Sequence, residues 1–151
     1  MEAHPELRTF LKPYSQEIQD IVWALRNFVV NVVPEANELI WDNYNALAMA
    51  YSKSEQLKDA FCHISVYAKH VNFGFNRGAE LSKASITLNG KGKLIRHIKV
   101  TNLNTFPKKD LKPMIWEALG ISEQLNPALG QRNIVPKSIV MSISEKKLRP
   151  N

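Results

Sequence analysis

Two histidines, a tyrosine and two asparagines recur at alternate positions in three short segments, and side chains of these types bind ligands or move protons. The segments are HISVYA (63–68), VNFGFN (71–76) and RHIKVT (96–101). Apolar residues alternate with polar ones in each, which predicts strands with one buried and one exposed face. The exposed face would gather His63, Ser65, Tyr67, Asn72, Asn76, His97 and Lys99, with His70 at the turn between the first two strands and Arg77 and Arg96 near the rim.

This polar face admits three interpretations. The first hypothesis is a non-enzymatic binding site for a small molecule or an anion, because ligand sites combine a concave surface with a few convergent polar groups. The second is an enzyme of unrecognised type, in which His63 or His97 acts as general base. The third is a face that is simply solvated, as is common in antiparallel sheets.

A second polar cluster interrupts the stretch ELIWDNYNALAMAYS (38–52) and consists of Asp42, Asn43, Tyr44 and Asn45. Large apolar residues occupy odd positions both before and after the interruption, which predicts one long bent strand rather than a tight hairpin. Asn43 and Asn45 would then lie mid-strand, where polar groups need partners from the protein or from a ligand. All four residues are therefore candidate ligand-binding residues.

Carboxylates concentrate near the start of the chain. Residues 1–42 hold seven acids and three bases, whereas the rest holds seven acids and seventeen bases, giving the whole chain a net charge of +6. Glu17 and Asp20 are three residues apart and can share one helix face, so they are the weak candidates for a metal site. Hard oxygen ligands would suit iron, but the basic remainder opposes cation capture. We therefore expect no cofactor, with iron as the alternative.

The elements that must position these groups are two helices and several strands. Ser15 can cap a helix whose apolar stripe runs from Ile18 to Val32 before Pro34. A second helix is predicted over residues 110–119, with Asp110 as its N-cap and Gly120 at its end. SIVMSIS (138–144) could add an edge strand, and EKKLRPN (145–151) is typical of a solvated basic tail.

This order of elements predicts a single α+β domain over residues 1–151, with a core at about 15–119 and a C-terminal extension at 120–151. Its antiparallel sheet would carry the helices on one face. The strand residues Ile64, Val66, Val71, Phe73, Phe75, Ile98 and Val100 would be buried beneath those helices.

Several classes of function are disfavoured. The chain shows neither a signal peptide nor an apolar run long enough to cross a membrane, and the single cysteine, Cys62, suits a reducing compartment, so a cytoplasmic protein is expected. Cys62 shares strand parity with Ile64, which predicts a buried thiol rather than a nucleophile. NGKGKLIRH (89–97) lacks the spacing of a phosphate loop. A nucleic-acid role is disfavoured because the aromatic residues alternate into the core. The oligomeric state is not predicted.

The segments DNYNALAMAYS, FCHISVYAKHVNFGFNRGAEL and GKGKLIRHIKV together resemble the YdhG-like family of small bacterial domains, over about residues 39–100. The resemblance implies a frataxin-like α+β fold and, for at least one member, a role as an intracellular iron chaperone. It implies no catalytic residues. Many members carry Trp-Gly-x-Pro-x-Tyr where this chain has Trp41-Asp42-Asn43-Tyr44-Asn45.

Overall fold

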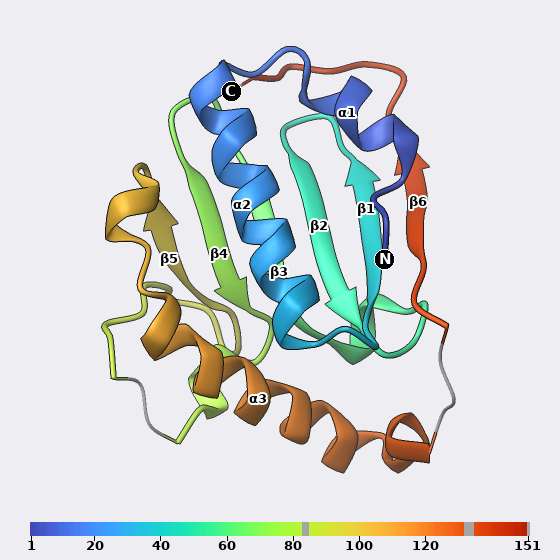
Figure 1. The fold of residues 1–151 in the computed structure, drawn as a ribbon, viewed down its shortest axis with the longest axis vertical. Helices are drawn as coiled ribbons and strands as arrows, with labels where there is room; N and C mark the ends of the chain where they lie inside the picture. Colours follow the sequence, from blue (N-terminus) through green and yellow to red (C-terminus); the bar gives the residue numbers. More distant parts are fainter. Residues whose placement is uncertain (83–84, 132–134, 151) are drawn as a thin grey trace.

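A six-stranded sheet carries the helices on one face, in a computed structural model that describes residues 1–82, 85–131 and 135–150 (Figure 1). The strand order is β5-β4-β3-β2-β1-β6. Helices and strands follow one another as α1 (Pro5–Leu11), α2 (Gln16–Val32), β1 (Asn37–Asp42), β2 (Leu47–Ser52), β3 (Ala60–Val66), β4 (Val71–Phe75), β5 (Arg96–Val100), α3 (Lys108–Leu125) and β6 (Ser138–Ile143). No helix within the described residues is long and apolar enough to span a membrane.

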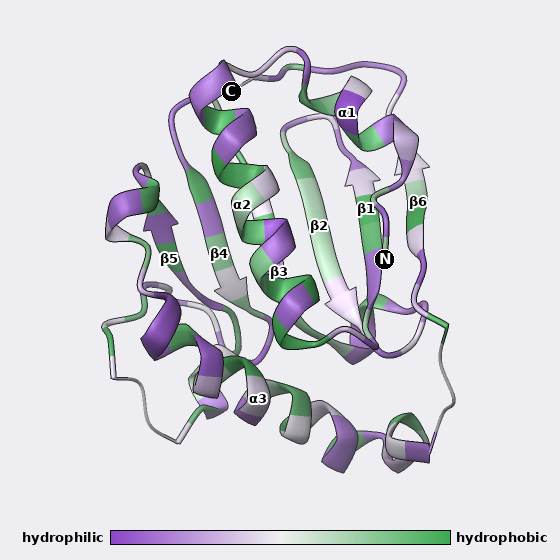
Figure 2. Ribbon diagram, in the orientation of Figure 1, coloured by the Kyte–Doolittle hydropathy of each residue, from purple (hydrophilic) through white to green (hydrophobic). Residues whose placement is uncertain are grey.

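Helix α2 lies across the sheet and was predicted nearly residue for residue. The Ser15 side chain accepts a hydrogen bond from the Ile18 backbone N–H, as an N-cap residue does. The helix ends at Val32, two residues before Pro34. Figure 2 shows its apolar and polar residues alternating around the helix, and the apolar stripe faces the sheet. The amphipathic period is therefore sufficient to define this element.

The core lies between the helices and one face of β2, β3, β4 and β5. Six of the seven strand residues predicted to be buried are inaccessible or nearly so, and Ile98 on the edge strand β5 is half-buried. Cys62 is also buried, and burial raises the pKa of its thiol well above the usual value. The β3–β4 hairpin turns at residues 67–70, as the sequence predicted. The α+β class is thus confirmed.

The stretch 38–52 is a hairpin, so the prediction of one long bent strand is wrong. β1 and β2 pair antiparallel, with Asp42 opposite Leu47 and residues 43–46 forming the turn. Partners in this register have opposite parity, because each pair combines an even with an odd position. Even positions of β1, such as Ile40, and odd positions of β2, such as Met49, therefore face the same core. Asn43 and Asn45 lie in the turn and are exposed.

The sheet is mixed rather than purely antiparallel. β6 pairs parallel to β1 at the edge, with Leu39 opposite Ile139, and the register shifts between Ile40 and Trp41. The edge strand itself was predicted, but its direction was not. A parallel partner needs a long crossover, and helix α3 supplies part of that connection.

Helix α3 is longer at both ends than the sequence predicted. It begins at Lys108, before the predicted N-cap Asp110, and Pro113 falls inside it. The helix also continues through Gly120 to Leu125. A glycine stops a helix when it adopts the left-handed conformation, and among the described residues only Gly90 has a positive φ. The expected C-terminal extension therefore supplies the end of α3 and the strand β6.

A buried polar network joins β1 to three other elements. Glu38 is fully buried on the core face of β1, and its carboxylate accepts hydrogen bonds from Arg26 Nε at 3.0 Å, Tyr51 Oη at 2.9 Å and Ser138 Oγ at 2.6 Å. Burial raises the pKa of the Tyr51 hydroxyl, and the carboxylate beside it raises that pKa further. The hydroxyl therefore stays protonated and donates to Glu38.

The last residues form a strap along the β1–β2 turn, contrary to the predicted solvated tail. We use the name C-terminal strap for residues 144–150. Lys147 and Arg149 form ion pairs with Asp42, whose side chain is fully buried, and Arg149 is itself nearly inaccessible. Arg149 Nη1 also donates to the Asn43 carbonyl oxygen at 3.2 Å, and the Leu148 N–H donates to the Tyr44 carbonyl oxygen at 2.9 Å. A buried carboxylate on β1 thus draws Arg149 inward and pairs with the ammonium group of the exposed Lys147.

Replacing Phe73 by alanine tests the core. Phe73 is fully buried and makes edge-to-face contacts with Phe75 and Phe106. We expect Phe73→Ala to lower the free energy of unfolding by about 3–5 kcal/mol in urea denaturation. The control Leu125→Ala removes a side chain that is 61% exposed and should change that free energy by less than about 0.5 kcal/mol. Equal effects for the two variants would contradict this core.

Replacing Arg149 by methionine tests the strap. The change leaves the buried Asp42 carboxylate with Lys147 as its remaining cationic partner. We expect a loss of about 3 kcal/mol in the free energy of unfolding, because an uncompensated buried charge is costly. The double variant Asp42→Asn, Arg149→Met should regain much of that loss. Lys146→Met, in the same segment but exposed, serves as the matched control and should be almost neutral. A cost for Arg149→Met no larger than for Lys146→Met would show that the strap is not held by Asp42.

Candidate functional site

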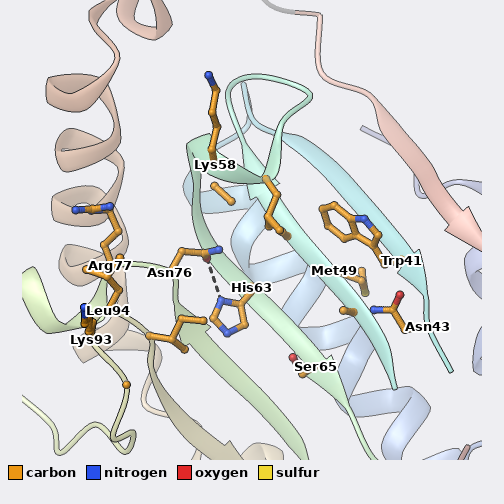
Figure 3. A pocket seen from close by; sticks show the side chains of 16 residues that line it. Trp41, Asn43, Met49, Lys58, His63, Ser65, Asn76, Arg77, Lys93 and Leu94 are labelled. Carbon is orange, nitrogen blue, oxygen red and sulfur yellow. Dashed lines mark hydrogen bonds between the residues drawn. The ribbon is translucent and has the colours of Figure 1, made fainter. Parts of the chain in front are cut away.

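The sheet face opposite the helices is hollow because small residues occupy its central strands. Ala48, Ala50, Ser65 and Gly74 point to this face from β2, β3 and β4, in register with one another or nearly so. Bulkier groups surround them, including Trp41 on β1 and residues 92–95 of the β4–β5 connection (Figure 3). The result is a cavity of about 780 Å³, which we call the open-face pocket. This volume is in the range of sites for small organic ligands.

Sixteen residues line the open-face pocket, and they come from β1, β2, β3 and the segments that precede β3 and follow β4. They are Trp41, Asn43, Ala48, Met49, Ala50, Leu57, Lys58, Ala60, His63, Ser65, Asn76, Arg77, Gly92, Lys93, Leu94 and Ile95.

His63 is the central polar group of the pocket, and Asn76 orients it. Its Nδ1 lies 2.9 Å from Asn76 Oδ1, and an amide oxygen only accepts, so Nδ1 carries the proton. Nε2 of the neutral ring is then an acceptor. The ring extends over Gly74, where an added Cβ would lie 2.4 Å from Nε2. Glycine at this position is therefore required for the observed ring orientation.

Burial lowers the pKa of the His63 imidazole, the hydrogen bond to Asn76 opposes that change, and the nearby His97 adds to the lowering. At neutral pH the ring is thus neutral and can accept a hydrogen bond from a ligand. It also has the protonation state of a general base, and the hydroxyl group in the described pocket lining is that of Ser65, two residues further along β3.

The charge of the pocket is one-sided. Lys58, Arg77 and Lys93 line it, and none of the aspartates or glutamates that the structure describes does. Arg77 forms an exposed ion pair with Glu80, with Nη2 and Oε2 3.0 Å apart. Lys58 and Lys93 are exposed and form no ion pair with any residue that the structure describes. The positive potential therefore favours an anion.

The pocket has distinct ends. Lys58 precedes β3, and Arg77 follows β4, so both lie at the same end of this antiparallel pair. Trp41 stands opposite Ala48, which in turn stands opposite Ser65, toward the other end of the strands. Figure 3 shows Arg77, Lys93 and Leu94 together on one side, Trp41, Asn43 and Met49 on the other, and His63 between them.

Four of the predicted ligand-binding residues line the open-face pocket: Asn43, His63, Asn76 and Arg77. Asn72 stands opposite Ser65, and His97 stands opposite Gly74, so both lie on the same sheet face as the pocket. Neither residue is part of the pocket lining. Tyr67 and His70 stack on each other at the β3–β4 turn, with ring centroids 4.8 Å apart.

The other predicted site residues lie elsewhere. Asp42 faces the core and pairs with the C-terminal strap, while Tyr44 and Asn45 are exposed in the turn. Arg96 faces the helix side, because it shares parity with Ile98, and its Nη1 donates to the carbonyl oxygens of Gly92 and Ile95. It thus fixes the connection that borders the pocket rather than lining it.

Sequence reasoning missed the floor and the apolar end of the pocket. The available signal was the run of alternate alanines, Ala46, Ala48 and Ala50, together with Gly74 inside a strand, since small residues at exposed strand positions leave space. Lys58 and Lys93 carried no such signal. Their position depends on long-range contacts such as the bond from the Ala79 N–H to the Leu94 carbonyl oxygen at 2.9 Å.

The predicted metal ligands lie away from the pocket. Glu17 and Asp20 are exposed on α2, and the Asp20 carboxylate accepts a hydrogen bond from Gln16. Glu38 and Asp42 are paired with Arg26, Lys147 and Arg149. Within the described residues, no group of three or more His, Cys, Asp or Glu side chains is arranged to hold a metal ion.

Comparisons with known proteins found no counterpart: the chain matches no protein-family model, no curated protein and no solved structure. The fold and the site together define this chain as an α+β domain with a cationic pocket on the open face of its sheet.

The titration of His63 tests the geometry of the pocket. Since the Asn76 hydrogen bond raises the pKa of His63 and burial lowers it, we expect Asn76→Ala to lower that pKa further below the usual value of about 6.5. NMR titration of the imidazole C–H signals measures the change. A rise in the His63 pKa in Asn76→Ala would contradict the hydrogen bond.

Proposed function

We propose that this protein binds a small organic anion in the open-face pocket and acts as a binding protein rather than an enzyme. The observation that carries the proposal is the lining itself: among the described residues, three cationic side chains and no carboxylate surround a floor of small and apolar residues. A ligand enclosed there exchanges water for apolar contact on one side and finds uncompensated positive charge on the other.

Two further features support the proposal. His63 offers a neutral acceptor held in place by Asn76, so the pocket contains one oriented polar group as well as charge. The resemblance to the YdhG-like family implies no catalytic residues, in keeping with a binding role. The frataxin-like fold and the family assignment remain predictions, as does the cytoplasmic location.

The iron-chaperone alternative would use different residues, Glu17 and Asp20 on α2, and a cation would be repelled by Lys58, Arg77 and Lys93. Substitutions at Glu17 and Asp20 therefore test iron binding, and substitutions at Lys58 and Lys93 test anion binding. The enzyme alternative rests on His63, which lines the pocket, whereas His97 does not.

A thermal-shift screen of small carboxylates, phosphates and sulfonates tests the proposal. We expect at least one anion to stabilise the protein, by about 2.7 kcal/mol at 100 times its dissociation constant. The double variant Lys58→Glu, Lys93→Glu should lower this stabilisation to about 1.4 kcal/mol at the same anion concentration, because reversing the charge at the rim weakens binding about tenfold. Lys12→Glu, Lys109→Glu changes the net charge equally at exposed residues outside the pocket and should retain it. A screen without a stabilising anion, or equal loss in both variants, would overturn the proposal.

A further inference from the structure

The open-face pocket is asymmetric along the strands, and its two ends differ in chemistry. The row that contains Trp41, Ala48 and Ser65 lies near one end. At the other end, the Asn76 N–H donates to the Phe61 carbonyl oxygen, so the next residue, Arg77, lies at this end of β3. Ser65 and Phe61 are four residues apart, which corresponds to about 13 Å along β3.

The cationic end offers two free ammonium groups to an anionic group. Lys58 and Lys93 are free of ion pairs within the described chain, and Arg77 lies at the same end with its guanidinium shared with Glu80. An ammonium group binds carboxylate and phosphate alike, as a point charge. Among the described residues, no charged side chain lines the apolar end, which consists of the Trp41 ring beside Ala48 and Ala50.

We propose that the ligand is an amphipathic anion, with a carboxylate or phosphate head at Lys58, Arg77 and Lys93 and an apolar body that lies over Ala48 and Ala50 against the Trp41 ring. This inference rests on the proposed function and adds the ligand class and its orientation. On β2 the side chains between the two ends are those of Ala48 and Ala50, so an extended hydrocarbon or a flat ring can lie along this strand beside His63. A compact anion such as inorganic phosphate would leave the Trp41 end unfilled.

Intrinsic fluorescence reports directly on this arrangement. The chain has three tryptophans, and Trp23 and Trp116 lie on α2 and α3, outside the pocket. In the variant Trp23→Phe, Trp116→Phe, all tryptophan emission comes from Trp41. Titration of this protein with butyrate, hexanoate, octanoate and octyl phosphate, below the concentration at which they aggregate, gives both affinity and a signal from the apolar end.

We expect the affinity to rise about fourfold for each added methylene, as complete burial of the apolar body requires. The Trp41 emission should shift to shorter wavelength with octanoate and remain unchanged with butyrate. Adding Lys58→Glu and Lys93→Glu should weaken the binding of every anion in the series by a similar factor of about ten. Comparison of octanoate with octyl phosphate shows which head group is preferred.

Calorimetry on Trp41→Ala in the otherwise native chain separates the contribution of the ligand's apolar chain to the affinity from that of its charged head. It should flatten the dependence of affinity on chain length and leave butyrate binding unchanged. If short and long anions bind equally and Trp41→Ala has no effect, the amphipathic ligand class is wrong while anion binding stands. If no anion in the series or in the wider screen binds, both proposals fall.

Discussion

The buried carboxylate of Glu38 is the constraint on which the arrangement of elements depends. A charge in the interior is strongly destabilising unless it is paired and fully hydrogen-bonded. Glu38 meets that requirement only when Arg26 of α2, Tyr51 of β2 and Ser138 of β6 are all in place. The His4 N–H in turn donates to Ser138 Oγ at 2.9 Å, so the segment before α1 is tied to the same group. The network therefore ties α2, β2 and β6 to one point on β1.

A second carboxylate on the same strand face extends the principle. Asp42 stands four residues beyond Glu38, at the end of β1, and the C-terminal strap supplies its cations. The strap also bonds to the carbonyl oxygens of Asn43 and Tyr44, so it sets the path of the β1–β2 turn. Asn43 lines the open-face pocket from that turn. The two sides of the sheet are thus connected: charge pairing on the helix side determines where one border of the pocket lies.

Much of the fold could be predicted because its strongest elements are periodic. The stripe of α2 and the alternation of β3 and β4 are local patterns, and each was found where the sequence placed it. The β1–β2 hairpin was missed because apolar residues at odd positions on both sides of residues 43–46 imitate a continuous strand. What distinguishes the two is that Glu38 and Asp42, at even positions, are buried as ion pairs. Their partners, Arg26, Lys147 and Arg149, lie outside this segment. The residue pattern of 38–52 alone therefore could not predict that Glu38 and Asp42 are buried.

The site was predictable to the extent that it depends on strand parity. His63 and Asn76 followed from alternation, and their mutual hydrogen bond required only that β3 and β4 form a hairpin. The cationic rim was not predictable, because the connection from β4 to β5 folds back through contacts such as the bridge between Asn89 and His97. The floor of the pocket could not be predicted from polar residues. A cavity is defined by the side chains that are small, and here these are the alternate alanines of β2.

The parallel pairing of β6 with β1 also has a consequence for the order in which the protein is made. Ser138 follows Glu38 by 100 residues, and Arg149 is later still. At about 5–20 residues per second, a ribosome needs roughly 5–20 s to bridge that gap. During this interval β1 can pair with β2, yet its outer edge has no neighbour. Glu38 lacks Ser138, and Asp42 lacks both of its ion-pair partners, Lys147 and Arg149. β1 is therefore the strand whose outer edge stays unpaired until β6 and the C-terminal strap have been synthesised.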